Sequence, residues 1–237
     1  ALLPADVTMI GSMFHGPPNA AARARALRFV GVAGAARGGA FPALGATTGE
    51  ARSIAAMFDA DRSPRVKLLL GDDATMDALG SLWRAGTDVL HIATHGLADL
   101  RQPMTSLLML PAKDANGAAT YLTAGQVQSW RGDADLVYLS ACETALGPAR
   151  FADGMPGLQR AFLRAGAHGV IATLWPIEDV YAGQFATDFY RRYTAGTPAP
   201  RALAETQRAW AQPASGLRAG EQAHRRMTAW AHAYYTP

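Results

Sequence analysis

The chain has 237 residues, of which 49% are hydrophobic, so it is long enough and apolar enough to bury a core of its own. Its 22 basic and 19 acidic residues give a formal net charge of +3, and the basic residues are scattered, so no concentrated stripe points to nucleic acid as a partner. The single cysteine, Cys142, excludes an internal disulfide and any zinc site built from two or more cysteines.

Short apolar runs alternate along the chain with longer stretches in which apolar residues recur every three or four positions. The first pattern is typical of strands buried on both faces, and the second of amphipathic helices. The predicted strands cover residues 27–33, 66–70, 89–94, 136–141 and 169–175. The predicted helices cover residues 48–58, 76–84, 124–130 and 155–165 between strands, and 181–193, 201–211 and 221–233 after the last strand. A short apolar run at 106–110, within an irregular segment at 97–120, predicts an extra hairpin or edge strand.

This alternation predicts an α/β fold with three layers, in which a mostly parallel central sheet is flanked by helices on both faces. We expect one domain over 1–237, with an N-terminal extension at 1–26, a sheet core at 27–176 and C-terminal helices at 177–237. No apolar stretch reaches the roughly 18–20 residues of a membrane helix, so we expect no membrane partner. A free thiol suits a reducing compartment, and we therefore expect the cytoplasm.

Two of the predicted strands end in residues that can carry chemistry. One strand runs from Asp88 to His95, the other from Asp135 to Cys142, and each reaches its reactive residue seven positions after the aspartate. Ligands of such sheets bind beyond the carboxyl ends of the strands. If the two strands are neighbours in register, about 4.8 Å apart, His95 and Cys142 leave the sheet at the same height.

This placement predicts a Cys/His dyad. Cys142 would supply the thiol nucleophile, and His95 would act first as the base and then as the acid for the leaving amine. Gly96 has no Cβ, so its backbone N–H can approach a substrate closely and, with the N–H of Cys142, form the oxyanion hole.

These residues also have other interpretations. A lone cysteine at the end of an apolar strand is more often a buried structural residue, and this alternative stays open. His91 and His95 have a spacing that suits a metal site on a helix, but in a strand they start about 13 Å apart, so no metal site is predicted and His91 is expected to be a hydrogen-bonded core residue. The glycine-rich segment 31–39 matches no phosphate-binding pattern, and no GxSxG serine motif is present.

Four motifs in order resemble the CHAT domain, a bacterial and eukaryotic branch of the caspase-like cysteine peptidases of clan CD that is related to caspases and separase. The motifs are VLHIATHG at 89–96, LSACETALG at 139–147, GLQRAFLRAGA at 157–167 and VIATLWPIED at 170–179, and the likeness spans about residues 28–235. The resemblance implies a caspase-like fold, a His95 and Cys142 dyad, an oxyanion hole at Gly96 and Cys142, and chemistry that needs no metal or cofactor.

The resemblance also suggests partners. The family's domain commonly follows tetratricopeptide repeats, so we expect this chain to be part of a longer one that acts on a protein or peptide substrate. Acidic residues near the carboxyl edge favour a basic residue before the cut, with Asp179 and Glu143 as substrate-binding residues. Acids also favour helix starts, which is an alternative explanation of Asp179.

Two further expectations concern what departs from the family. The family ends in an aromatic segment that leads into a last strand, and here the chain stops at Pro237, so we expect the sheet to lack that edge strand. A non-catalytic interaction module on the same scaffold, a pseudo-peptidase, is the alternative to an active enzyme.

Overall fold

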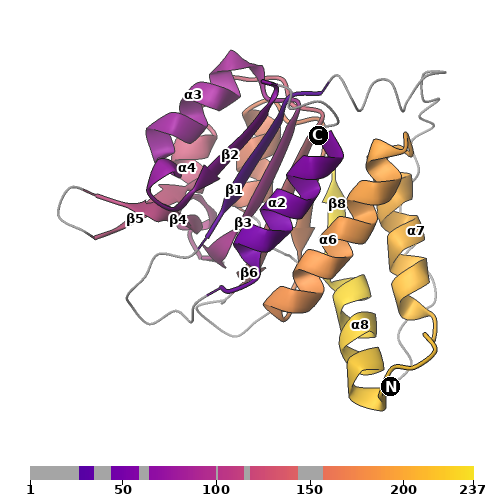
Figure 1. The fold of residues 1–237 in the computed structure, drawn as a ribbon. Coiled ribbons are helices and arrows are strands. Elements are labelled where there is room, and N and C mark those ends of the chain that lie inside the picture. The colour runs from indigo at the N-terminus through magenta and orange to yellow at the C-terminus, as the bar shows by residue number, and fades with distance from the viewer. Residues whose placement is uncertain (1–26, 35–43, 59–63, 100, 115–117, 144–156) are drawn as a thin grey trace.

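The computed structural model describes residues 27–34, 44–58, 64–99, 101–114, 118–143 and 157–237. Over these ranges the predicted α/β architecture is confirmed: a mostly parallel sheet lies between two layers of helices (Figure 1). The strands are β1 (Phe29–Ala33), β2 (Val66–Leu70), β3 (Val89–Leu97), β4 (Leu107–Lys113), β5 (Ala119–Thr123), β6 (Leu136–Glu143), β7 (Val170–Thr173) and β8 (His232–Tyr235). The helices are α2 (Thr47–Phe58), α3 (Met76–Gly86), α4 (Ala124–Val127), α5 (Leu158–Arg164), α6 (Asp179–Thr194), α7 (Ala199–Ala211) and α8 (Ala219–Ala231), with 3₁₀ turns η1 (Gly71–Asp73) and η2 (Pro103–Thr105).

The main sheet has the strand order β2-β1-β3-β6-β7-β8. Its first five strands are parallel, which places all of their carboxyl ends at one edge. β4 pairs antiparallel with the end of β3 and with β5, so the irregular segment at 97–120 does form the predicted hairpin. β3 runs three residues and β6 two residues further than the apolar pattern predicted, because the two strands stay paired with each other up to Gly96 and Glu143.

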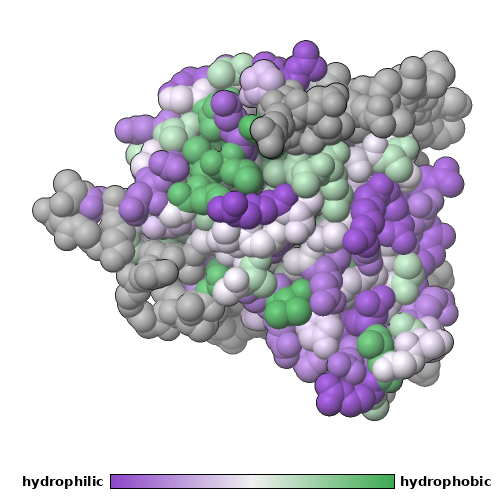
Figure 2. Space-filling model, in the orientation of Figure 1, coloured by the Kyte–Doolittle hydropathy of each residue, from purple (hydrophilic) through white to green (hydrophobic). Residues whose placement is uncertain are grey.

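The two faces of the sheet are covered by different helices. Leu90 and Ile92 of β3 pack with α3, α4 and α5, whereas Val89 of the same strand packs with α2, α6, α7 and α8. This is the period-two alternation of a strand buried on both sides. Where the surface is described, the side that carries α6, α7 and α8 is mostly hydrophilic, with its hydrophobic residues in small groups (Figure 2).

Local signals explain where the helices start. Thr75 has extended backbone angles and accepts a hydrogen bond from the N–H of Ala78, which caps α3. Thr123 and Gln126 form a reciprocal capping box at α4, which is why a helix of only four residues begins sharply there. Each of these threonines directly precedes the first residue of its helix.

The expectation that the sheet lacks its last strand is wrong. α8 ends at Ala231, and His232–Tyr235 pairs antiparallel with β7 as the edge strand β8. His232 is buried, and the hydroxyl of Tyr234 lies so close to Gly169 that a Cβ there would come within 2.1 Å of it. Aromatic residues favour strands when they pack on a pleated surface, and this packing ends the helix two residues earlier than predicted.

Candidate active site

The ends of β3 and β6 bring the two predicted reactive positions together. The strands are parallel neighbours, and their register pairs His95 with Cys142 and Gly96 with Glu143. The expectation that these strands are adjacent and in matching register is therefore confirmed. Adjacent strands are about 4.8 Å apart, so the two backbones are within the span that a thiol and an imidazole can bridge.

The histidine side of this pair is described more fully than the cysteine side. His95 is 4% exposed and lies near the end of β3. Cys142 and Glu143 are described as part of β6, and their side chains lie outside the described part of the structure. Their predicted roles as nucleophile and substrate-binding residue therefore stay predictions.

Gly96 is held from both sides. It pairs with Glu143 of β6 on one side and with Leu108 of β4 on the other. A backbone with a strand on each side has little freedom, which is the rigid setting that a preorganised oxyanion donor requires. The use of its N–H as such a donor stays a prediction.

A tight turn follows β3 and borders the same edge. Asp99 accepts hydrogen bonds from the N–H groups of Arg101 and Gln102 and from the hydroxyl of Thr105, each at 2.9 Å. These bonds hold the pKa of Asp99 below its usual value, with the Gln102 N–H the largest cause. The carboxylate is thus occupied in shaping the turn.

Gly157, just before α5, packs against this turn. It precedes α5, and a Cβ on it would lie 1.6 Å from the carbonyl oxygen of Pro103 in η2. No side chain larger than hydrogen fits there unless the turn moves. The backbones of Pro103 in η2 and Gly157 before α5 are therefore in direct contact.

Asp179, predicted to bind substrate, opens α6. One oxygen of its carboxylate accepts a hydrogen bond of 2.7 Å from the N–H of Ala46, just before α2. This bond ties the starts of α2 and α6 together at the edge where the parallel strands end. A contact between Asp179 and a substrate stays a prediction.

A buried polar cluster lies on the α2 and α6 side of the sheet. Nε2 of His91 is 3.1 Å from Oε1 of Glu50 in α2, and both side chains are at most 1% exposed. Tyr138, the register partner of His91, and Tyr190 of α6 lie within 5.5 Å of the imidazole, measured between ring centroids. Burial, with the Glu50 carboxylate as a further cause, raises the pKa of both phenols well above the usual value. His91 is thus buried in the core as predicted, but the predicted hydrogen bond is not found: within the described residues neither ring nitrogen has a hydrogen-bond partner, and the ion-pair contact comes from Glu50 of a helix.

Sequence reasoning missed the role of Glu50. Its position three residues after Thr47 is typical of a capping-box glutamate, which reaches back to the helix start. Here the same side chain turns into the core and meets His91. Glu50 lies on the apolar face of α2, and this position in the sequence pattern could have indicated that its side chain is buried.

The described residues lack two kinds of feature. They contain no group of three or more His, Cys, Asp or Glu side chains placed to hold a metal ion. None of the helices in the described ranges is both long and apolar enough to cross a membrane.

The sheet order, the flanking helices and the paired strand ends define a caspase-like α/β protein. The crystal structure of the Arg-specific cysteine proteinase gingipain R has the same fold, with a TM-score of 0.54 and 10% identity over 88% of this chain and 46% of that one. A family model of the CHAT domain matches residues 7–236, and the chain therefore belongs to the CHAT domain family.

A curated relative shares part of the sequence. Tetratricopeptide repeat protein 28 of Mus musculus is 37% identical over 87 residues. The match covers 37% of this chain but 4% of the relative, so the chain corresponds to a small part of that protein.

Proposed function

We propose that the chain is a cysteine endopeptidase in which Cys142 and His95 form the catalytic dyad. The observation that carries the proposal is the β3–β6 register, in which these residues stand opposite one another at the carboxyl edge of the sheet. Membership of the CHAT family and the caspase-like fold support the same class of chemistry.

The chemistry follows from these two groups. His95 accepts the thiol proton as the sulfur of Cys142 attacks the scissile carbonyl carbon, and the carbonyl oxygen becomes an oxyanion facing the N–H groups of Gly96 and Cys142. When the tetrahedral intermediate collapses, the C–N bond breaks and His95 returns the proton to the leaving amine. Water, deprotonated by His95, then attacks the thioester carbon; the C–S bond breaks, the acid product is released, and His95 returns the proton to the sulfur of Cys142.

For the substrate we propose a protein or peptide cut after Arg or Lys, with Glu143 and Asp179 as the acidic residues that contact the basic side chain. Glu143 is next to Cys142 and is paired with Gly96, so its backbone is at the reacting edge. Asp179 opens α6 at the same edge of the sheet. We also propose that the chain is part of a longer protein with tetratricopeptide repeats, which the match to the mouse relative supports.

Hydrolysis of fluorogenic peptides tests the dyad. We expect cleavage by the wild-type chain and a loss of at least about 100-fold in Cys142→Ala and in His95→Ala, since general base and nucleophile act as a unit. His168→Ala is the matched control, because His168 is exposed and pairs with Asp133 outside this edge. Undiminished cleavage by either dyad variant would overturn the proposal.

Peptides that differ only in the residue before the cut test the specificity. Arg and Lys should be preferred over Asp, Leu and Ala, and Glu143→Gln or Asp179→Asn should reduce that preference more than it reduces cleavage of a neutral peptide. A preference for acidic or apolar residues would contradict the basic pocket and leave the dyad intact.

The second candidate is a non-catalytic interaction module. The burial of His95, at 4% exposed, favours it, because a catalytic imidazole must reach the substrate. A folded chain that binds peptides but cleaves none of them would support the module over the enzyme.

A further inference from the structure

β2 is an edge strand of the main sheet. It pairs in parallel with β1, and within the described residues no strand pairs with it on the other side. Its residues Val66, Leu68, Leu69 and Leu70 are each only half-buried, whereas every residue of β1 is buried. Figure 2 shows a hydrophobic patch over this strand. An apolar edge with an open row of backbone groups is a template for pairing with another chain.

The backbone groups that point away from β1 follow from the register of the two strands. The N–H of Phe29 in β1 donates to the carbonyl of Arg65, just before β2, at 2.9 Å. Because the direction of bonding alternates along a strand, the odd-numbered residues of β2 bond to β1. The even-numbered residues Val66, Leu68 and Leu70 therefore direct their N–H and C=O groups outward.

The helix next to β2 leaves this outer edge accessible. α2 contacts β1, β2 and β3, so it is centred over β1 and does not extend past β2. A strand of another chain can thus approach the outward row of N–H and C=O groups in the plane of the sheet.

The sequence of β2 is complementary to itself when two copies run antiparallel. With Leu69 at the centre, Leu68 faces Leu70 of the second copy, and Leu69 faces its own equivalent. The outward groups of Leu68 and Leu70 meet in this register, and each such pair exchanges both of its backbone hydrogen bonds. Leucine meets leucine on both faces of the sheet, which stabilises cross-strand pairs.

The charges at the two ends of β2 fit the same register. Lys67 is exposed near the start of the strand, and Asp72 and Asp73 are exposed in η1, directly after its end. With Leu69 at the centre, Lys67 faces Gly71 of the second copy and lies beside the two aspartates of that copy. An edge lysine commonly prevents pairing with other chains. Here it disfavours the registers in which two lysines would meet and favours the one in which each meets carboxylates.

We propose that β2 is a dimer interface, through which two copies of the chain pair antiparallel and join their sheets into one. A second copy supplies all that this edge calls for: an outward row of backbone groups, three leucines, and carboxylates beside Lys67. A two-fold axis at Leu69 relates the copies, and two-fold dimers are the commonest symmetric assembly. β1 separates β2 from the strands β3 and β6 of the candidate dyad, so each copy keeps its own site.

Sedimentation equilibrium of the Cys142→Ala chain tests the proposal, because this substitution removes the only thiol that could link two copies covalently. We expect the dimer to form as the concentration rises from about 1 µM to about 1 mM. Lys67→Asp places like charges beside the aspartates and should raise the dissociation constant at least about tenfold, and adding Asp73→Lys should restore most of the affinity. Arg226→Asp, the same change of charge on an exposed residue of α8, is the matched control and should have no effect.

Amide hydrogen exchange locates the contact on the strand. The N–H groups of Leu68 and Leu70 should exchange at least about tenfold more slowly in the dimer than in the monomer. Those of Lys67 and Leu69 are bonded to β1 in both states and serve as the internal control. Neither measurement involves peptide cleavage, so the result does not depend on the proposed peptidase activity.

Three results would overturn the proposal. The first is a chain that stays monomeric at about 1 mM, whatever covers β2. The second is a dimer that responds to Lys67→Asp no more than to Arg226→Asp, because its interface then lies elsewhere. The third is a dimer in which the amides of Leu68 and Leu70 gain no protection.

Discussion

The two faces of the sheet are built differently. The face under α3, α4 and α5 is an apolar layer in which Trp83, Trp130 and Phe162 contact one another. The buried indole N–H of Trp83 donates a hydrogen bond to the carbonyl of Ala165. The opposite face, under α2 and α6, encloses Glu50 and His91 within its aromatic core.

The difference follows the reactive strands. His91 is four residues before His95, and Tyr138 is four residues before Cys142, so the buried polar layer lies two same-face positions below the candidate dyad on both strands. Buried polar groups lower stability, and proteins usually keep them where function requires them. The apolar face therefore supplies stability, and the polar face carries the buried polar residues that lie below the candidate dyad.

The largest effect is expected on the apolar face. Trp83→Ala removes a side chain that is 1% exposed and leaves a cavity, which should lower the free energy of unfolding by about 3–5 kcal/mol. Trp230→Ala on α8, where the side chain is 48% exposed, is the matched control and should change it by about 0.5 kcal/mol or less. Urea unfolding followed by far-ultraviolet circular dichroism measures the free energy of unfolding of both variants. Similar losses in Trp83→Ala and Trp230→Ala would show that the apolar face does not dominate stability.

The buried pair tests the polar face. Glu50→Leu alone or His91→Leu alone leaves one buried polar partner without the other and should cost about 3 kcal/mol. The double variant removes both and should recover most of that loss. If the two single losses simply add in the double variant, Glu50 and His91 are not coupled and the comparison of the faces fails.

A pH dependence of stability should come from His232, also on the polar face. Burial lowers its pKa from 6.5 to about 4, against an opposing hydrogen bond to the carbonyl of Thr228. The unfolded chain then binds the proton more tightly than the folded one, so stability falls as the pH drops from 6.5 toward 4. The wild-type chain should lose about 2 kcal/mol between pH 7.5 and pH 5 through this group.

Urea unfolding at the two pH values checks this prediction. His232→Gln should show a pH dependence smaller by that amount, since it has no titrating side chain at this position. An identical pH dependence in wild type and variant would rule out His232 as the source.

The smallest effect concerns a single hydroxyl. The buried OH of Tyr138 has no hydrogen-bond partner in the described ranges, so Tyr138→Phe should be neutral or stabilise the fold by up to about 1 kcal/mol. Thermal unfolding measures it, with Tyr121→Phe on the exposed strand β5 as control. A clear loss of stability would mean that the hydroxyl is paired and that the polar layer is better satisfied than its contacts indicate.

Features set by local pattern were predictable from the sequence. The five parallel strands, the helices between them and the hairpin at 107–123 all follow from apolar period and turn residues. The equal spacing from Asp88 to His95 and from Asp135 to Cys142 also anticipated the register of β3 and β6, because parallel neighbours that start level stay level.

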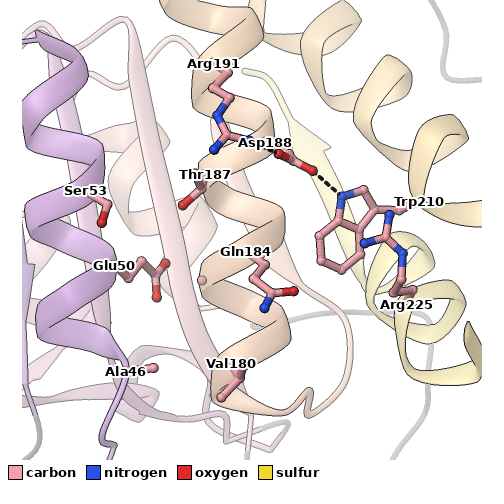
Figure 3. Close-up of a pocket in the computed structure, with 11 residues that line it drawn as sticks. Ala46, Glu50, Ser53, Val180, Gln184, Thr187, Asp188, Arg191, Trp210 and Arg225 are labelled. Carbon is pink, nitrogen blue, oxygen red and sulfur yellow. Dashed lines mark hydrogen bonds and ion pairs between the residues drawn. The ribbon is translucent and has the colours of Figure 1, made fainter. Parts of the chain in front are cut away.

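Features set by long-range packing were not predictable. Glu50 reaches His91, and Asp179 binds the N–H of Ala46, over separations in sequence that no local pattern encodes. The edge strand β8 was not predicted for the same reason. Its residues form a strand because they pair with β7 and because Tyr234 packs against Gly169. The pocket lined by Glu50, Gln184, Trp210 and Arg225 (Figure 3) likewise depends on the packing of four helices, α2, α6, α7 and α8.

The most direct test of the dyad is the rate at which a peptidyl acyloxymethyl ketone modifies the folded chain, followed by intact mass and peptide mapping. We predict one adduct, on Cys142, that forms at least about 100-fold more slowly in His95→Ala at unchanged circular dichroism. A thiol that does not react in the native chain, or one that reacts equally fast without His95, would contradict the assignment of the dyad to the paired ends of β3 and β6.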